Sequence, residues 1–148
     1  MFEYINIMVR ISNLELVRLL KKNSRTSFVD LARHLKVSET AVRKRIRNME
    51  KGGVIRKYTV DVDPRKIGFE IDALIGVDAR PEKYVQVMEK IRPMKEVMTF
   101  CSSSGDHMMM MECWLENSAS LASFVKTLGK IDGVTKVCPA IISDKMKC

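Results

Sequence analysis

The chain has 148 residues, of which 46% are hydrophobic and 30% are charged. This length suffices for one ordinary domain or two small ones, and the composition is that of a globular protein rather than a disordered one. The sequence has no uncharged apolar run long enough to cross a membrane, and its first residues lack the features of a signal peptide. We therefore expect a cytoplasmic protein without membrane contact.

The charge is divided unevenly along the chain. The net charge is +8, and residues 1–68 carry 16 Lys/Arg and 7 Asp/Glu, whereas residues 69–148 carry 10 Lys/Arg and 11 Asp/Glu. A basic half beside a neutral half indicates one module that binds a polyanion and a second module with another role.

Three amphipathic helices are predicted in the basic half. Apolar residues recur at helical spacing over residues 12–22, and two further stripes follow. Ser27 and Ser38 are placed to cap the second and third helices, and Gly52-Gly53 ends the third near Lys51. The inward residues of the second and third helices are Phe28, Leu31, Ala32, Leu35, Val42, Ile46 and Met49.

The connection between the second and third helices is that of a helix-turn-helix, with the small residue Ala32 where the helices cross. Lys36 occupies the turn position where glycine is common, which predicts a strained or altered turn. We expect the third helix to enter the major groove of double-stranded DNA. The predicted DNA contacts are Ser38, Glu39, Thr40, Arg43, Lys44 and Arg47.

The predicted contacts differ in their chemistry. Arg43 and Lys44 can donate to guanine or to phosphate, and Thr40 can contact a thymine methyl group or a phosphate. The helix start at Ser38 offers backbone N–H groups to a phosphate oxygen. Glu39 would repel a phosphate there, so it either accepts from a cytosine amine or points away.

Other basic residues have different expected roles. Arg45 lies between the inward and outward faces of the third helix, and we favour a structural role, with Glu50 or Asp30 as its partner, over DNA contact. The downstream residues that could hold flanking DNA backbone are Arg56, Lys57, Arg65 and Lys66.

The end of the basic half has the pattern of a strand. Residues 57–63 alternate between apolar and polar, which predicts a strand that could form one arm of a wing. Asp63-Pro64 and Gly68 then punctuate the chain. The predicted organisation is a helix-turn-helix domain with its following strand over residues 1–63, a linker over residues 64–68 and a second domain over residues 69–148.

The second half has the order βαββαβ of a ferredoxin-like unit, so the predicted fold class is α+β. The predicted strands cover residues 71–77, 97–101, 108–115 and 134–142, with helices over residues 81–91 and 118–128. Two helices would cover one face of the sheet. Because residues 108–111 and 140–142 are apolar on both faces, we expect a second copy of the chain to cover the other face, with Ile141 in the interface.

The sequence shows no motif in which residues able to act in catalysis or to bind a metal are closely spaced. His34 and His107 lie in different modules, and the chain has no Gly-rich phosphate loop or paired carboxylates, so we expect neither an enzyme nor a cofactor. The four cysteines lack the close spacing of zinc ligands. We interpret them as free thiols, with a disulfide as the alternative.

The run of methionines over residues 108–111 has two interpretations. With His107 and Cys113 beside it, the run could indicate a copper site. However, successive side chains in a strand point to opposite faces. We therefore favour packing by the methionines, and we expect no metal.

A set of residues in the first half matches a known pattern. These residues are Arg25, Ser27, Leu31-Ala32, Ser38, Val42, Arg45-Ile46, Met49-Glu50, Gly52-Gly53-Val54-Ile55, Tyr58 and Ile67-Gly68. Through them and through the βαββαβ order, roughly residues 9–144 resemble the Lrp/AsnC family of transcription regulators. The resemblance implies a sequence-specific DNA-binding regulator with a RAM-type regulatory domain. It also implies homodimers that assemble further into tetramers or octamers, and an amino acid effector.

The resemblance directs attention to the turn before the third strand of the second half. The family commonly has Gly-x-x-Asp there, whereas this chain has Gly105-Asp106-His107-Met108 and so lacks the final acid. The predicted effector-binding residues are Ser104, Gly105, Asp106 and His107, and Asp106 could replace the missing acid. A plain hairpin turn is the alternative, because Ser, Gly and Asp are ordinary turn residues.

Two other function classes stay open. The first is a sequence-tolerant architectural DNA-binding protein on the same fold, and the second is a small-molecule-binding module without DNA activity. A regulator should prefer its operator over random DNA by on the order of a thousand-fold, which an architectural protein should not.

Overall fold

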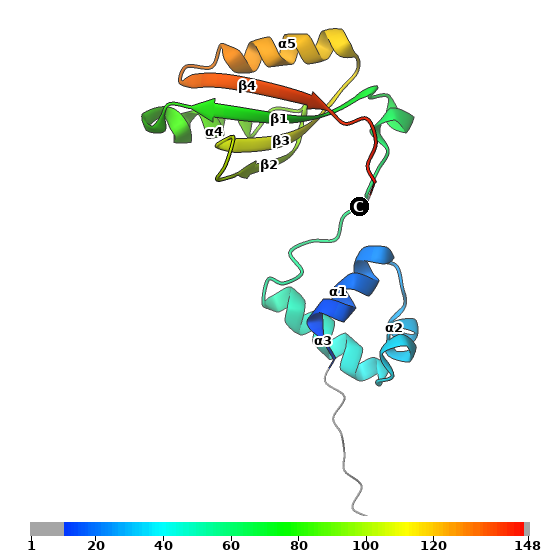
Figure 1. Cartoon of the computed structure of the whole chain (residues 1–148). Coiled ribbons are helices and arrows are strands. Elements are labelled where there is room, and N and C mark those ends of the chain that lie inside the picture. The colour runs from blue at the N-terminus through cyan, green and yellow to red at the C-terminus, as the bar shows by residue number, and fades with distance from the viewer. Residues whose placement is uncertain (1–10, 147–148) are drawn as a thin grey trace, which may run out of the picture. The chain divides into compact units, whose positions relative to one another are not determined.

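A computed structural model describes residues 11–146 (Figure 1). The chain divides into two compact units between Val60 and Asp61, and each unit is described by itself. In the described part, no helix is long and apolar enough to cross a membrane.

The first unit contains the helices α1 (Asn13–Lys22), α2 (Phe28–Leu35) and α3 (Glu39–Lys51). The predicted caps are confirmed, because the hydroxyls of Ser27 and Ser38 accept from backbone N–H groups three residues later. The predicted core is also confirmed, except that Phe28 is only half-buried. The buried residues are Leu16, Leu31, Ala32, Leu35, Val42, Ile46 and Met49.

The turn between α2 and α3 is strained, as predicted. Lys36 has φ 54° and ψ 43°, and it is the one non-glycine residue with positive φ in the described part of the chain. A left-handed conformation costs an L-residue with a Cβ atom about 1–2 kcal/mol. The turn is held in place by the N–H of Val37, which donates to the Ala32 carbonyl at 3.0 Å.

The strand predicted over residues 57–63 is not formed. A strand needs a neighbouring strand for its N–H and C=O groups, and the described part of the first unit consists of helices and connecting segments. Val60 is 78% exposed. The hydroxyl of Tyr58 instead donates to a carboxylate oxygen of Glu50 at 2.7 Å, which ties this segment to the end of α3.

The segment predicted as a linker has regular structure. Residues Pro64–Ile67 form the 3₁₀ helix η1, which is part of the second unit. Asp63 caps it by accepting from the N–H of Arg65 at 3.1 Å, and Gly68 ends it with φ 102°. The sequence Asp63-Pro64 favours a helix start as much as a turn, because proline suits the first helical position.

The second unit contains a sheet with the strands β1 (Ile71–Ala79), β2 (Val97–Ser102), β3 (Met109–Leu115) and β4 (Val134–Ile141). Its helices are α4 (Tyr84–Ile91), after the short 3₁₀ helix η2 (Pro81–Lys83), and α5 (Ser118–Gly129). The strand order is β2-β3-β1-β4 with antiparallel neighbours, so the predicted βαββαβ fold is confirmed.

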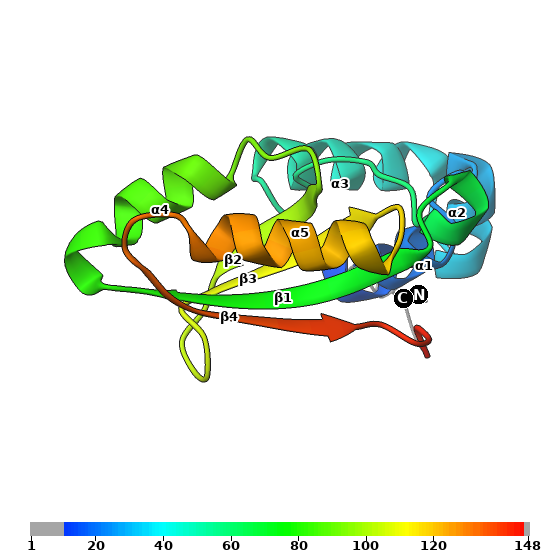
Figure 2. The same ribbon diagram turned by 90° about the horizontal axis from the view of Figure 1, so that it is seen from above.

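Helices α4 and α5 cover one face of this sheet (Figure 2). Ala73, Ile75 and Val77 of β1 are buried in the same cluster as Ile91 of α4 and Leu128 of α5. The methionine run alternates as predicted, because Met109 and Met111 are buried there while Met110, between them, is only half-buried.

The other face of the sheet, called the open face here, differs from the prediction. Leu74 lies opposite Ala140 and belongs to the open face, whereas Ile141 lies opposite buried Ala73. Ile141 is therefore on the helix-covered face, and its predicted place in an interface across the open face is wrong. A shift of one residue along a strand reverses the side chain's direction.

The open face is also less apolar than predicted. The strand register adds Met110 and Trp114 to Leu74 and Ala140, but it also places carboxylates among them. The acidic residues of the open face are Asp72, Asp78 and Glu112.

Candidate functional site

The outward face of α3 brings together most of the predicted DNA contacts. Glu39, Thr40, Arg43, Lys44 and Arg47 are all exposed, and their spacing places them on one side of the helix. This face presents three cationic side chains within two helical turns, and the start of the helix presents backbone N–H groups.

Ser38 begins α3 and has a structural role. Its hydroxyl accepts from the N–H of Ala41 at 3.1 Å, and its carbonyl accepts from the N–H of Val42. Ser38 thereby fixes the helix start that the predicted phosphate contact requires.

Arg43 is held by two neighbours. Its Nη2 atom lies 2.5 Å from Oε1 of Glu39, one turn earlier in the same helix. Its guanidinium carbon lies 4.5 Å from the centre of the Phe28 ring, at the start of α2. Glu39 therefore points at Arg43. The Phe28 ring contacts the Arg43 guanidinium group, which its predicted place in the core did not indicate.

A solvent-open cavity of about 480 Å³ lies beside this pair. Its lining includes Phe28 and Arg43, together with the hydroxyl-bearing residues Ser24, Thr26, Ser27 and Tyr58. The bond to Glu50 raises the pKa of Tyr58 to about 12, so this hydroxyl stays neutral and keeps donating its one proton to Glu50. All of these residues belong to the first unit.

The partners predicted for Arg45 are wrong. The carboxylate of Asp30 bonds with Ser27 and Arg33, and Glu50 accepts from Tyr58. Arg45 is half-buried, and its Nε atom has no hydrogen-bond partner among the described residues. The sequence alone did not show that Ser27, Arg33 and Tyr58 would be the partners of these two acids.

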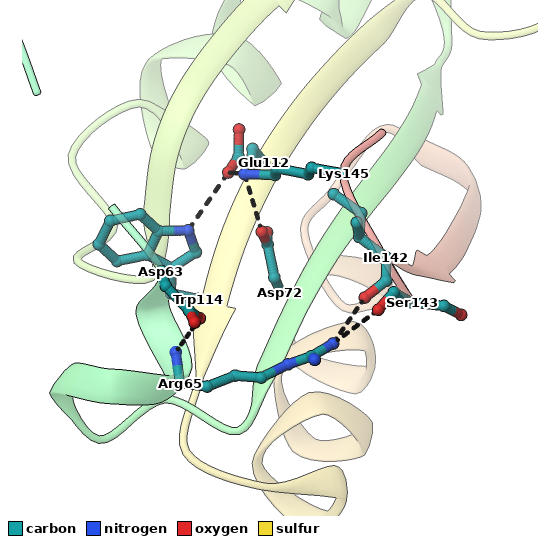
Figure 3. Close-up of polar contacts among 8 residues, drawn as sticks. All are labelled: Asp63, Arg65, Asp72, Glu112, Trp114, Ile142, Ser143 and Lys145. Atoms are coloured by element: carbon teal, nitrogen blue, oxygen red, sulfur yellow. Dashed lines mark hydrogen bonds and ion pairs between the residues drawn. The ribbon is translucent and has the colours of Figure 1, made fainter. Parts of the chain in front are cut away.

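The basic residues after α3 fall into two groups. Arg56 and Lys57 are exposed in the first unit, and Lys66 is exposed in the second. Arg65 contacts the C-terminal segment, because its Nη2 atom donates to the carbonyls of Ile142 at 3.3 Å and Ser143 at 3.0 Å (Figure 3).

The predicted effector residues lie in the loop between β2 and β3. Ser104, Gly105 and Asp106 are exposed at its tip, and Gly105 has φ 148°. The loop is closed by Ser103, whose N–H donates to the Met108 carbonyl at 2.9 Å and whose hydroxyl donates to the His107 carbonyl at 2.6 Å.

His107 turns from this loop toward β1. Its Nδ1 atom lies 2.9 Å from Asp78, whose other oxygen accepts from the N–H of Met108 at 2.9 Å. The ring lies so close to Gly76 that a Cβ atom there would be 2.2 Å from it. Asp78 is thus the acid that holds this turn, and the suggestion that Asp106 replaces the missing acid of the effector site stays a prediction.

Hydrogen bonds explain the low pKa of Asp78. The bonds from His107 and from the Met108 N–H lower the pKa of Asp78 below its ordinary value. Asp78 was not among the predicted site residues, although two acids in an otherwise apolar strand, Asp72 and Asp78, were a usable signal.

A second polar cluster joins the C-terminal segment to the sheet (Figure 3). The Lys145 ammonium lies 2.8 Å from Glu112 and 3.0 Å from Asp72, whose side chain is buried. These two acids raise the pKa of Lys145 above its ordinary value. Burial raises the pKa of Glu112, but hydrogen bonds from Lys145 and Trp114 outweigh burial and lower it.

Metal and thiol chemistry has little support in residues 11–146. No group of three or more His, Cys, Asp or Glu side chains in this range could hold a metal ion. Cys101, Cys113 and Cys138 are free thiols, and burial raises the pKa of Cys113 to about 12. Cys148 lies outside the described residues.

Comparison with known proteins gives the family. A family model of winged helix-turn-helix DNA-binding domains matches residues 10–56, and the model of the Lrp/AsnC ligand binding domain matches residues 72–148. The HTH-type transcriptional regulator LrpA of Pyrococcus horikoshii is 45% identical over 133 residues, which are 89% of this chain and 94% of that protein. The chain belongs to the Lrp/AsnC family.

Other similarities agree with this Lrp/AsnC assignment. The regulator LrpA1 of Halobacterium salinarum is 33% identical over 129 residues, covering 86% of this chain and 91% of that protein. The structure of AsnC from E. coli matches with a TM-score of 0.77 at 21% identity, over 94% of this chain and 96% of that one. A regulator from Neisseria meningitidis in complex with L-Met matches with a TM-score of 0.81 at 19% identity, over 94% of both chains.

The assignment confirms the predicted class of function. This Lrp/AsnC protein is a DNA-binding transcription regulator and not an enzyme. The likeness to the solved structures confirms the predicted α+β fold, a helix-turn-helix unit followed by a four-stranded sheet with two helices.

Proposed function

We propose that this protein is a sequence-specific regulator that reads operator DNA with the outward face of α3. Thr40, Arg43, Lys44 and Arg47 would contact bases and phosphates, while the helix start at Ser38 would bind a phosphate oxygen. The observation that carries this proposal is the exposed face of α3, where the side chains suited to base contact lie on one side of a capped helix.

A double variant tests this assignment. Arg43→Ala with Arg47→Ala is expected to remove specific binding, because both guanidinium groups leave the proposed contact face. Arg18→Ala with Arg33→Ala removes the same charge from exposed positions of α1 and α2 and should weaken binding less. Operator binding that survives the first pair unchanged would show that α3 does not read the DNA.

The architectural alternative predicts a different preference. The basic first half supports phosphate contact in either case, so salt dependence alone does not separate the two functions. Selection of bound sequences from random DNA does, because a regulator yields a consensus bound on the order of a thousand-fold more tightly than random sequence. Selected pools without a consensus would favour the architectural function.

We also propose a homodimer across the open face, which could assemble further into tetramers or octamers. The support is the apolar part of that face, where Leu74 is 40% exposed opposite Ala140. On the β3 side Leu74 is opposite Glu112, and Met110 is opposite Gly76. A dimer would place two copies of α3 on DNA, as half-sites one helical turn apart require.

An amino-acid-like effector is the last part of the proposal, with Ser104, Gly105, Asp106 and His107 as its contacts. The support is an exposed loop tip above half-buried His107, together with the description of the matching family model as a ligand binding domain. Thermal unfolding with each of the twenty amino acids tests it, since a ligand that binds the folded state raises the melting temperature. No shift with any of them would exclude this class of ligand.

A further inference from the structure

Phe28 and Glu39, the two neighbours of Arg43, affect which groups of DNA Arg43 can contact. The Phe28 ring lies against the guanidinium carbon at 4.5 Å, and Glu39 bonds to Nη2. Lys44 and Arg47 differ, because neither forms an ion pair with any residue in the range 11–146. Among the proposed contacts, Arg43 alone is held in this way.

The arrangement leaves Arg43 able to donate. An aromatic ring contacts the flat face of a guanidinium group, and the N–H groups lie in the plane of that group and point outward. Glu39 accepts from one N–H of Nη2, so the second N–H of Nη2 and an N–H of the neighbouring nitrogen remain as a pair of donors on the other edge of the group. A guanine base offers two acceptors in the major groove, and contacting them requires a guanidinium group in a fixed orientation.

The arrangement also changes the charge that DNA meets. Glu39 and Arg43 together carry no net charge, so the pair adds little to the attraction of phosphates. An unpaired arginine on a flexible chain binds a phosphate of any sequence equally well.

We propose that Glu39 is a positioning residue which, with Phe28, makes Arg43 a reader of bases rather than a phosphate contact. This inference rests on the proposed function, in which α3 reads the operator. It assigns Glu39 a specificity role without direct DNA contact, and it gives Phe28 a role in recognition in addition to packing.

Glu39→Gln tests the proposal with two measurements that move in opposite directions. The variant and the wild-type protein are titrated with the selected operator and with random DNA over a range of salt concentrations. Affinity for random DNA is expected to rise, and the slope of log K against log salt should steepen by about one, because freed Arg43 gains a phosphate. The preference for the operator is expected to fall at least about fivefold.

Two further variants separate positioning from charge. Glu15→Gln removes the same charge from the first turn of α1 and should leave the preference for the operator unchanged. Phe28→Leu keeps an apolar side chain but removes the ring. It is expected to lower the preference several-fold without steepening the salt slope, since no charge changes. Thermal unfolding of each variant verifies that it is folded.

The outcomes distinguish a failure of the positioning role of Glu39 from a failure of the proposed function. A wild-type operator preference that Glu39→Gln and Phe28→Leu leave intact would overturn the positioning role while the proposed function stands. Equal effects of Glu39→Gln and Glu15→Gln would also overturn it, since charge alone would then explain the change. A wild-type protein without any operator preference would overturn the proposed function and this inference together.

Discussion

Leu74 and Ile141 lie on opposite faces of one sheet, although they occupy adjacent register positions of the paired strands β1 and β4. Leu74 is opposite Ala140, and Ile141 is opposite Ala73. Their exposed fractions are similar, at 40% and 54%. The two residues therefore form a matched pair that tests which face of the sheet binds a second copy of the chain.

Leu74→Asp is expected to dissociate the proposed dimer, because it places a second carboxylate opposite Glu112 in the proposed interface, without a cation to pair with it. Ile141→Asp introduces the same charge on the helix-covered side and should leave the dimer intact. Light scattering after size-exclusion chromatography measures the mass of each variant. A dimeric Leu74→Asp protein, or a monomeric Ile141→Asp protein, would contradict the proposed interface.

Lys36→Gly is expected to raise the free energy of unfolding by up to about 1 kcal/mol. Glycine relieves the left-handed strain at φ 54°, and this gain exceeds the loss from its greater freedom in the unfolded chain. Lys21→Gly, in the exposed part of α1, removes the same side chain and should destabilise by about 1 kcal/mol. Chemical denaturation measures the change in the free energy of unfolding for both variants, which should have opposite signs. Destabilisation by Lys36→Gly would show that the Lys36 side chain contributes more to stability than relief of its backbone strain.

Asp78→Asn is expected to destabilise the protein by about 1–2 kcal/mol at neutral pH, because a charged acceptor of two hydrogen bonds is lost. The lowered pKa of Asp78 means that its stabilisation is fully present above the ordinary value of 3.8 and is lost as the pH falls through the lower value of the folded state. Thermal unfolding of both proteins between pH 7 and pH 3 should therefore show a difference that shrinks below about pH 4. A difference independent of pH would indicate that packing against His107, and not charge, is responsible.

Lys145→Met is expected to destabilise by about 1–3 kcal/mol, because buried Asp72 and half-buried Glu112 lose the cation between them. The pKa of Glu112 should rise toward or above its ordinary value of 4.5, so that acid destabilisation begins at higher pH. NMR titration of Glu112 measures this shift directly. Lys130→Met, at an exposed position after α5, serves as the control and should change neither quantity.

Local patterns in the sequence were sufficient for the helices, for the four strands of the second unit and for most of the core of the first unit. Capping depends on residues within three positions, so Ser27 and Ser38 could be read directly. The helical stripes predicted the buried residues of α2 and α3, and the position of Lys36 predicted its strained turn. The βαββαβ order and the family pattern then predicted the fold, because both can be read along the sequence without knowledge of contacts between distant residues.

Contacts between distant segments were decided only by the tertiary structure. Which face of the sheet carries Ile141 depends on the register of β4 against β1, and a one-residue difference reverses it. The partners of Asp78, Asp72 and Arg65 lie about 30 to 80 positions away in the sequence. Residues 57–63 remained without a partner strand in the first unit, so their alternation did not suffice to form one.

On α3 the sequence determined which residues face outward, because helical periodicity alone sets that face. It did not determine that Arg43 would lie against Phe28, since this contact requires the start of α2 to pack beside α3. The charged residues of α3 could be counted from the sequence, but the positions of the Arg43 side chain and the Phe28 ring are defined only by the packed helices.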